Sequence, residues 1–375
     1  MFFRVLETDP GSGARRGLLA LAHGSVDTPC FMPVGTNASV KAVKSRDLED
    51  MGVTLILGNT YHLSLRPGPE VIAQAGGLHS FMGWKRNILT DSGGYQVFSL
   101  APFRKIENEG VRFKSHIDGS THSLTPERVV ELQTVFGSDV MMPLDVCTAP
   151  GIPYAEAKAA LALTTAWLSR SKTAWARCEG PLRGELFGIM QGNFYKELRK
   201  ESAEGMIGLD LPGYAIGGLS VGEDFPIFLD FLSLSAGLLP REKPRYLMGI
   251  GTPRYILEAV EAGIDLFDCV FPTRTARNAQ VFTRDGPLSL RNEKNRLDFG
   301  PIDPSCGCET CSRHTRGYLR HLFKAREIQA AVLATCHNLF FIQELIQGIR
   351  RSIEDRAFLA FKKAFLFRYE GNADN

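Results

Sequence analysis

The feature that most constrains the fold of this chain is an alternation of eight short apolar runs with helix-like segments. The runs are rich in β-branched residues, as buried strands are, and they cover residues 31–34, 54–57, 88–90, 140–144, 186–190, 214–216, 245–248 and 266–268. Helical patterns lie between them, and both Thr125-Pro126 and Thr252-Pro253 pair an N-cap residue with proline at the first helical position. Eight strand–helix units within roughly 250 residues predict a (β/α)8 barrel.

A doubly wound sheet is the alternative architecture, but it usually has fewer strands and a G-x-G-x-x-G loop after the first one. No such loop follows residues 31–34. Polar residues or glycines follow most of the runs: Asn59, Asp91, Asp145, Gln191, Gly217-Gly218, Gly249 and Asp268. In a barrel these positions face one rim, where catalytic groups of different strands converge. Any one of them can equally be a turn residue, but three aspartates and a glutamine together favour a site.

Three additions flank or interrupt the repeat. Residues 2–29 predict an N-terminal pair of antiparallel strands that caps the barrel, and residues 111–124 predict a β-hairpin around Asp118-Gly119, a strong turn dipeptide. Residues 273–324 interrupt the pattern after the eighth run, and from 326 onward the chain reads as helical. The expected fold is an α/β barrel with an insertion after its last strand and a C-terminal helical segment.

The insertion contains three closely spaced cysteines, Cys306, Cys308 and Cys311. A disulfide framework spreads its cysteines through a small secreted chain, whereas a reduced protein that binds a metal clusters them. Three thiolates at this spacing favour one structural Zn²⁺ in a closed tetrahedral site, and three unmetallated core cysteines are the plain alternative. Spacing alone leaves the fourth ligand open among His314, His321, Cys336 and His337.

Composition bears on compartment and partners. No apolar run is long enough to span a bilayer, and the N-terminus meets charged residues at once, so we expect a cytoplasmic protein without a membrane partner. The formal net charge of +2 is nearly neutral. Between residues 272 and 326, however, eleven Lys and Arg stand against five Asp and Glu, which favours a nucleic-acid partner for the insertion.

The polar residues at the predicted rim suit chemistry on a nucleoside. Asp145 follows a wholly apolar run and is expected at the edge of a dry pocket with the Gln191 amide. The carboxylate can accept from ring N–H and NH₂ groups while the amide donates to a carbonyl, as a guanine-like edge requires. Asp91 and Asp268 supply the two carboxylates that substitution at an anomeric carbon usually needs. These residues alone also allow a metal-assisted hydrolase or an aldolase-type barrel.

Taken in order, several long motifs resemble the queuine/archaeosine tRNA-ribosyltransferase family, the tRNA-guanine transglycosylases. The resemblance begins at His23-Gly24-Ser25, reaches the C-terminal helices, and is carried by residues 31–36 (FMPVGT), 57–63 (LGNTYHL), 91–96 (DSGGYQ), 215–219 (AIGGL), 246–249 (YLMG) and 267–274 (FDCVFPTR). Motifs of this length in this order are very specific. The resemblance implies a single barrel domain over 1–375, with a zinc-binding subdomain at 273–340, in a bacterial-type enzyme that works as a homodimer.

The activity that the resemblance implies is exchange of guanine 34 in tRNAs with a G-U-N anticodon. The incoming base would be 7-aminomethyl-7-deazaguanine, the precursor in queuosine biosynthesis, and the intermediate a covalent aspartyl-ribose. By motif position, Asp268 would be the nucleophile that attacks C1′ of the ribose. Asp91 would be the general acid and base, protonating the departing guanine and deprotonating the incoming base.

The resemblance also implies roles in binding the substrates and the metal. It assigns the base edge to Asp145, Gln191 and the Gly218 amide, the base faces to Tyr95 and Met248, the anticodon loop to Arg274 and Arg277, and the fourth zinc position to His337. Cys336 is then a bystander, and His314 and His321 are surface or helix residues.

Departures from the family pattern bear on which base is incorporated. Bacterial relatives often read Asp-Glu-Cys where this chain has Asp145-Val146-Cys147, and residues 271–277 look more like eukaryotic catalytic subunits. Against that, Val221 stands where eukaryotic enzymes tend to carry glycine, which opens space for the bulky ring of queuine. Cys147 and Val221 therefore favour the smaller aminomethyl precursor, with direct use of queuine as the alternative. The extra C-terminal domains typical of archaeal enzymes are missing, which argues against archaeosine synthesis.

Two other classes of function explain part of the sequence. A non-catalytic, zinc-bearing tRNA-binding subunit would keep the barrel and the metal, but it has no need of Asp91 and Asp268. A free-nucleoside glycosidase would keep the carboxylate chemistry, but the basic insertion would have no purpose. The exchange enzyme is the prediction that accounts for both features.

Overall fold

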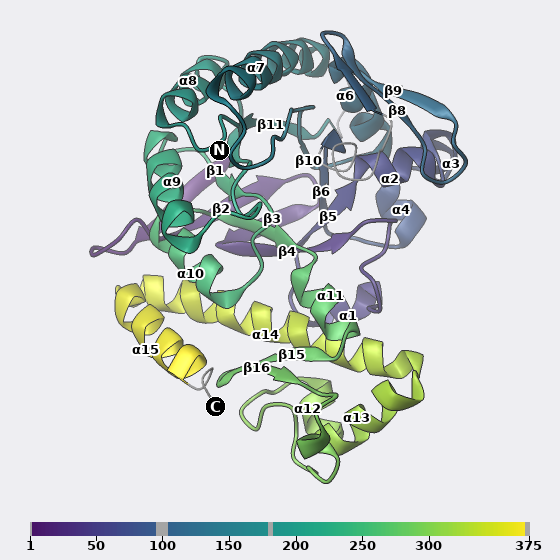
Figure 1. Cartoon of the computed structure of the whole chain (residues 1–375), viewed down its shortest axis with the longest axis vertical. Helices are drawn as coiled ribbons and strands as arrows, with labels where there is room; N and C mark the ends of the chain where they lie inside the picture. Colours follow the sequence, from purple (N-terminus) through teal and green to yellow (C-terminus); the bar gives the residue numbers. More distant parts are fainter. Residues whose placement is uncertain (1, 95–103, 179–182, 372–375) are drawn as a thin grey trace.

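The eight predicted strands form a closed parallel barrel, seen at the top of Figure 1, which confirms the predicted fold class. The computed structural model describes residues 2–94, 104–178 and 183–371. In order around the barrel the strands are β4 (Cys30–Gly35), β5 (Leu55–Asn59), β6 (Asn87–Asp91), β10 (Val140–Met141), β11 (Glu185–Met190), β12 (Gly213–Ile216), β13 (Arg245–Leu247) and β14 (Leu266–Cys269). Because β14 pairs with β4, the last strand lies beside the first one.

Strand β10 is shorter than the apolar run of 140–144 that predicted it. Its successor Met142 still donates its backbone N–H to Thr90 O at 3.2 Å, but Pro143 has no N–H to extend the ladder. The strand therefore ends early and the chain turns into the loop that carries Asp145.

Helices surround the barrel on its outer side (Figure 1). They are α1 (Ser45–Asp50), α2 (Thr60–Leu65), α3 (Pro69–Gln74), α4 (Leu78–Met82), α6 (Pro126–Phe136), α7 (Tyr154–Ala176), α8 (Lys196–Ile207), α9 (Phe225–Leu238) and α10 (Pro253–Glu261). The Thr125 side chain caps α6 by accepting from Arg128 N at 3.2 Å, as predicted. Thr252 occupies the N-cap of α10, but its side chain makes no capping bond there.

The N-terminal segment forms a three-stranded antiparallel sheet instead of the predicted strand pair, with the order β1 (Phe3–Thr8), β2 (Arg15–Leu21) and β3 (Gly24–Thr28). The third strand forms because residues 24–28 turn back at once and pair along β2, with Gly17 opposite Thr28. Phe3, Leu19 and Val26 pack into the same apolar cluster as side chains from inside the barrel, so the sheet closes its amino-terminal mouth.

The predicted hairpin of 111–124 is present as β8 (Gly110–Lys114) and β9 (Thr121–Leu124), and it gains a third strand, β7 (Arg104–Glu107). Gly110 makes this close pairing possible. A Cβ on it would lie 2.2 Å from Leu124 O, and its φ of +156° is one that other residues rarely adopt.

The chain after β14 builds a separate lobe below the barrel (Figure 1). Its elements are α11 (Phe271–Arg277), β15 (Gln280–Thr283), β16 (Gly286–Ser289), the short 3-10 helix η1 (Glu293–Asn295), α12 (Glu309–Arg313), α13 (Arg316–Ala325), α14 (Ile328–Glu354) and α15 (Phe358–Gly371). Among the described helices, none is long and apolar enough to cross a membrane.

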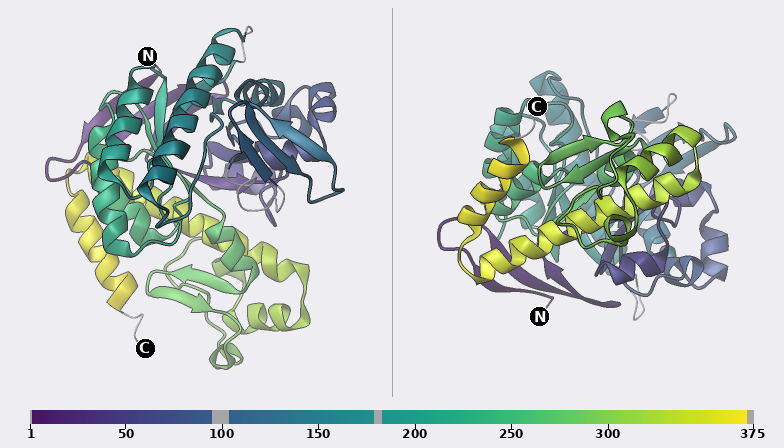
Figure 2. Two further views of the ribbon diagram at one scale, coloured as in Figure 1. Left: turned by 45° about the horizontal axis from the view of Figure 1, so that its top comes forward. Right: turned by 90° about the horizontal axis from the view of Figure 1, so that it is seen from below.

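Helix α14 connects this lobe to the barrel, and it runs between the two in Figure 1 and in the left view of Figure 2. On the lobe side, the Asn338 side chain accepts from Phe282 N at 3.0 Å and donates to Pro272 O at 2.9 Å. On the barrel side, Gln343 donates to Phe31 O of β4 at 3.4 Å. One helix therefore carries hydrogen bonds to both parts of the molecule.

Candidate functional site

Asp91 ends β6 at the carboxyl rim of the barrel and lies buried beside the end of β5. Register pairs Asn59 with Asp91, and Asn59 Nδ2 donates to Asp91 Oδ2 at 2.5 Å. Thr60 N, at the start of α2, donates to Asp91 Oδ1 at 3.0 Å. Both carboxylate oxygens are thus held in place by the neighbouring strand and the helix that follows it.

Asp268 lies on the same rim, in β14. Its Oδ1 accepts two hydrogen bonds, from Tyr246 Oη at 2.6 Å and from Gly249 N at 2.9 Å. Burial raises the pKa of Asp268, and these two donors act against that rise because they stabilise the anion. Since both bonds go to Oδ1, no hydrogen bond from the described residues occupies Oδ2, which can take another partner. Sequence reasoning missed Tyr246, which reads as one more apolar residue of a buried strand.

The carboxylates of this rim influence one another. Burial raises the pKa of Asp91 to about 7, and the negative charges of Asp268 and Asp145 add to the rise. A carboxyl group with a pKa near neutrality can both donate and accept a proton at physiological pH. The rim therefore holds two carboxyl groups of different character: Asp91, with a pKa near neutrality, and Asp268, whose hydrogen bonds favour its anion.

Asp145 and Gln191 meet as the sequence predicted. Gln191 Nε2 donates to Asp145 Oδ2 at 2.7 Å, and Ser92 Oγ lies 3.4 Å from the other oxygen, Oδ1. Burial raises the pKa of Asp145 to about 6, against these hydrogen bonds. A cavity of only about 10 Å³ lies beside Gly94, Asp145 and Cys147, close to the space of one water, so these residues are tightly packed.

Gly217 and Gly218 pack directly against the Gln191 amide. A Cβ on Gly217 would lie 2.7 Å from Gln191 Nε2, and one on Gly218 would lie 2.7 Å from Gln191 Oε1. The φ of Gly218, +67°, is also left-handed. Only glycines therefore allow the end of β12 to approach this amide so closely.

A fully buried arginine that the sequence analysis missed holds this region together. Arg199 of α8 donates from Nε to Asn193 O at 2.9 Å, from Nη1 to Gly217 O at 2.7 Å and from Nη2 to Gly218 O at 3.2 Å. Burial lowers the pKa of Arg199 to about 10, which leaves it charged. Its guanidinium thus ties the loop after β11, which carries Gln191, to the glycines after β12. Within the charged pattern of 195–206, Arg199 reads as a solvent-facing residue, and no sequence signal separates it from its neighbours.

The other predicted base-binding residues lie around this cluster. Met248 follows β13 and is partly buried against the barrel interior. Cys147 is buried two residues after Asp145, and burial raises the pKa of its thiol to about 12. Val221 N donates to Glu223 Oε2 at 2.9 Å in the loop after β12. Tyr95, the second predicted ring contact, lies outside the described residues.

Arg274 and Arg277 lie on α11, the helix that begins two residues after the end of β14 and three residues after Asp268. Arg274 is exposed and Arg277 is partly buried, with Nη1 donating to Thr273 O at 2.8 Å. Burial and the nearby charge of Arg274 lower the pKa of Arg277. Within the described part of the chain neither guanidinium has a carboxylate partner, so both charges next to the carboxyl-terminal rim of the barrel are available to an anion.

The predicted metal ligands come together from three segments. Cys306, Cys308 and Cys311 place their Sγ atoms 3.8, 3.4 and 3.3 Å from His337 Nδ1, and all four residues are buried. His337 Nε2 lies 2.7 Å from Phe282 O, which fixes the proton on Nε2 and leaves Nδ1 to face the thiols. Cys336 is not part of this group.

The donor set fits a thiophilic cation. The neighbouring thiols lower the pKa of Cys311 to about 4 and raise the pKa of Cys308, because three adjacent thiols cannot all ionise without a positive charge among them. Three sulfurs and one imidazole are the ligands of a closed, structural zinc site. The cluster can therefore hold a metal ion.

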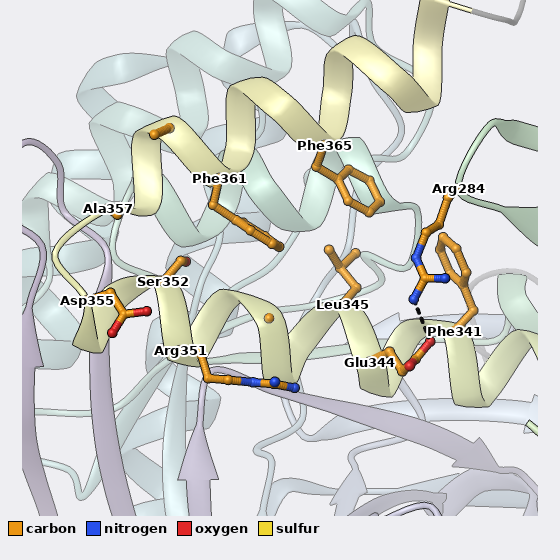
Figure 3. A pocket seen from close by; sticks show the side chains of 12 residues that line it. Arg284, Phe341, Glu344, Leu345, Arg351, Ser352, Asp355, Ala357, Phe361 and Phe365 are labelled. Carbon is orange, nitrogen blue, oxygen red and sulfur yellow. Dashed lines mark hydrogen bonds and ion pairs between the residues drawn. The ribbon is translucent and has the colours of Figure 1, made fainter. Parts of the chain in front are cut away.

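A cavity of about 590 Å³ lies away from these sites, between α14 and α15 (Figure 3). Phe341, Leu345, Phe361 and Phe365 form its apolar walls, and the ion pair of Arg284 with Glu344 closes one end. None of the predicted site residues lines this cavity.

Comparison with known proteins adds a family match. The family model described as queuine tRNA-ribosyltransferase matches residues 9–371. Curated proteins of that name are 51% identical in Caldanaerobacter subterraneus (99% of this chain, 98% of the relative) and 51% identical in Treponema denticola (99% and 98%). A further one, from Borrelia hermsii, is 50% identical over 99% of each chain.

Proposed function

Because the chain belongs to the queuine tRNA-ribosyltransferase family, and is thus a pentosyltransferase of the tRNA-guanine transglycosylase type, we propose that it exchanges guanine 34 of G-U-N tRNAs for 7-aminomethyl-7-deazaguanine in queuosine biosynthesis. The observation that carries this proposal is the pair of carboxylates on the barrel rim. Asp268 is held by Tyr246 and Gly249 N, and Asp91 has a pKa near neutrality.

The first half of the reaction forms a bond between Asp268 and the ribose. Asp268 Oδ2 attacks C1′, the bond from C1′ to N9 of guanine breaks, and its electron pair leaves with the base. Oδ2 is the suitable atom because Oδ1 already accepts two hydrogen bonds. Asp91, protonated at first, gives its proton to the departing guanine and becomes a carboxylate, which a pKa of about 7 permits.

The second half runs in reverse with the new base. Asp91, now ionised, takes the N9 proton of the incoming 7-deazaguanine, whose N9 then attacks C1′. The ester bond to Asp268 breaks and the carboxylate is regenerated, so that two displacements retain the configuration at C1′. The two aspartates return to their starting protonation states.

The residues around Asp145 are proposed to read the base. The carboxylate accepts from the N–H and NH₂ groups of the guanine edge, and Gln191 and the Gly218 amide donate to its carbonyl. The packing of Gln191 against Gly217 and Gly218, fixed by Arg199, supports this role because it holds the Gln191 amide next to the backbone of the two glycines. Met248 and Tyr95 are proposed to contact the two faces of the ring.

The remaining assignments concern RNA, metal, assembly and the size of the base. Arg274 and Arg277, which have no carboxylate partner among the described residues, are proposed to bind phosphates of the anticodon loop. The Cys306/Cys308/Cys311/His337 cluster is proposed to hold Zn²⁺, which would fasten the loop before α12 to α14. A homodimer is proposed from the family pattern. Cys147 and Val221 are proposed to exclude queuine by filling the space that its ring needs.

Release of radiolabelled guanine from G-U-N tRNA tests the proposal, with the aminomethyl base and queuine supplied in parallel to zinc-replete protein. Release with the aminomethyl base alone is the expected result. Release with queuine would keep the chemistry and overturn the argument from Cys147 and Val221. No release with either base, while tRNA binding persists, would indicate the non-catalytic subunit.

The variant Asp268→Asn separates these alternatives further. It should bind tRNA as the parent does, form no covalent adduct with it and release no guanine. Full exchange by this variant would exclude Asp268 as the nucleophile. Activity on free guanosine without activity on tRNA would indicate a nucleoside glycosidase.

A further inference from the structure

A second cluster of metal-binding side chains lies outside the sites described so far. His23 comes from the turn between β2 and β3, His79 from α4, and Asp139 from the residue before β10. Their ligand atoms all lie within 4.8 Å of one another. We propose that His23, His79 and Asp139 form a second, exchangeable binding site for a divalent transition-metal ion.

The geometry of the two imidazoles directs one nitrogen of each toward the same carboxylate. The rings stack with centroids 3.7 Å apart and an interplanar angle of 16°. His23 Nδ1 lies 2.7 Å from Asp139 Oδ1, and His79 Nε2 lies 3.2 Å from Asp139 Oδ2. Ligand atoms of a tetrahedral ion with bonds of about 2.0–2.1 Å are about 3.3 Å apart. All three ligand atoms already lie within 4.8 Å of one another, and a tilt of the two stacked rings toward each other would bring both ring planes onto an ion that replaces the shared proton.

The charge on Asp139 supports a cation at this position. Its side chain is fully buried, and a buried carboxylate needs a compensating positive charge. Within the described residues, the ion-pair partners of Asp139 are these two histidines alone, and a neutral imidazole supplies no charge. Ile88 N donates to Asp139 Oδ2 at 2.7 Å, which holds the carboxylate in position as second-shell bonds hold metal ligands.

The cluster is separate from the catalytic rim. Ile88 lies near the start of β6 and Asp91 at its end, so three residues, or about 10 Å of strand, separate the two ends. Asp139 lies at the amino-terminal side of the barrel, whereas Asp91 and Asp268 lie at the carboxyl-terminal rim. A metal ion here would not contact the reacting ribose, so its effect would be on stability.

The donor atoms and their exposure define the class of ion. Two imidazole nitrogens and one carboxylate oxygen suit Zn²⁺, Ni²⁺ or Co²⁺ rather than Mg²⁺ or Ca²⁺, which prefer oxygen ligands. The side chains of His23 and His79 are 25% and 13% exposed, so water can complete the coordination and the ion can exchange. The buried Cys306/Cys308/Cys311/His337 cluster, in contrast, is closed to solvent.

Binding at this site would fasten three segments at the base of the barrel. Asn87 already anchors the His23 turn, since its side chain accepts from His23 N at 3.1 Å and donates to Gly24 O at 3.0 Å. An ion would join that turn to α4 and to β10. Because it binds only where the three segments meet, it would stabilise the folded state and raise the melting temperature.

Equilibrium dialysis of zinc-loaded protein against Ni²⁺, followed by elemental analysis, tests the proposal. The parent should retain one zinc and take up one nickel per chain, with a higher melting temperature in nickel. His79→Ala and His23→Gln should each keep the zinc and lose the nickel together with its stabilising effect. His122→Ala, which removes an exposed histidine bonded to Ser120, is the matched control and should bind nickel as the parent does.

Two results would overturn the proposal. One is a parent protein that takes up no nickel at concentrations of about 100 μM, where a weak specific site is still detected as a shift in stability. The other is nickel that remains bound in both histidine variants. Circular dichroism of each variant establishes that it is folded, and His23→Gln is the milder change because its side chain is the more exposed one. Guanine exchange should remain at the parent level in both variants.

Discussion

Replacing Tyr246 by phenylalanine would remove one hydroxyl group from the interior of the barrel and leave the ring that packs there. The lost group donates to Asp268 Oδ1 at 2.6 Å, and Tyr246 is fully buried. A hydrogen bond to a charged group contributes about 1.5–3 kcal/mol. At pH values below the pKa of Asp268, the variant should lose roughly ten- to hundredfold in kcat/KM, because a smaller fraction of Asp268 is ionised without this bond. Gly249 N, which also donates to Oδ1, keeps the effect from being larger.

The pH dependence of the variant gives a second readout with a definite sign. Burial raises the pKa of Asp268, and the Tyr246 bond opposes that rise. Without the bond, the pKa rises further, so the acidic limb of the kcat/KM profile should move to higher pH. The assay is guanine exchange into tRNA measured across the pH range.

Tyr214→Phe is the matched control for this change. Tyr214 is a buried phenol of the same size on the neighbouring strand β12, and its Oη accepts from Leu211 N at 3.2 Å, away from both catalytic aspartates. It should lose stability to a similar extent and keep its kcat/KM and its pH profile. Equal effects of the two substitutions, or an unshifted acidic limb in Tyr246→Phe, would refute the assignment of Tyr246 as a positioning residue for the nucleophile.

Three other predictions follow from the site. With the pKa of Asp91 at about 7, release of guanine in the first half-reaction should decline as the pH rises through 7, because Asp91 loses the proton that it gives to the base. A single-turnover rate that stays level to pH 9 would contradict this. Because the Arg199 guanidinium holds Gly217 O and Gly218 O, Arg199→Met should raise KM for the incoming base roughly tenfold with a smaller change in kcat. Arg199→Lys, which keeps a positive charge, should show a smaller rise in KM. Cys308→Ser should release the zinc, as measured by elemental analysis, and should lower the free energy of unfolding by more than about 2 kcal/mol, as measured by denaturant titration. A variant as stable as its parent would show that the cluster holds no structural ion.

The barrel could be predicted from the sequence because each of its strands overlaps a short, mainly apolar run, as strands buried on both faces do. The runs at 31–34 and 266–268 coincide with β4 and β14 to within two residues. The third strands of the two small sheets could not be predicted in this way. Strand β3 (Gly24–Thr28) and strand β7 (Arg104–Glu107) are short, polar and half exposed, so neither has an apolar pattern.

The candidate site likewise has residues that the sequence pattern predicts and residues that it does not. Asp91 and Asp268 lie at the ends of strands, Gln191 follows β11, and Asp145 lies in the loop after β10. The barrel topology alone brings these four residues to one rim. Tyr246 and Arg199 act through contacts with residues more than ten positions away in sequence, Tyr246 with Asp268 and Arg199 with Gly217 and Gly218. Their roles depend on distances that local sequence patterns do not contain. His23, His79 and Asp139 meet for the same reason, from three segments that share no motif.

The hydrogen bonds of α14 determine how the barrel and the lobe below it are oriented relative to each other. His337 and Asn338 attach it to the lobe below the barrel, and Gln343 attaches it to the barrel one and a half turns later. An α-helix turns by about 100° per residue. One residue inserted between Asn338 and Gln343 would therefore rotate the lobe around the helix axis, while the Cys306/Cys308/Cys311/His337 cluster and the aspartates of the rim would all remain in the chain. If the lobe binds RNA as proposed, such an insertion would change how the RNA is oriented relative to Asp91 and Asp268 without altering any of the side chains proposed to bind or react with it.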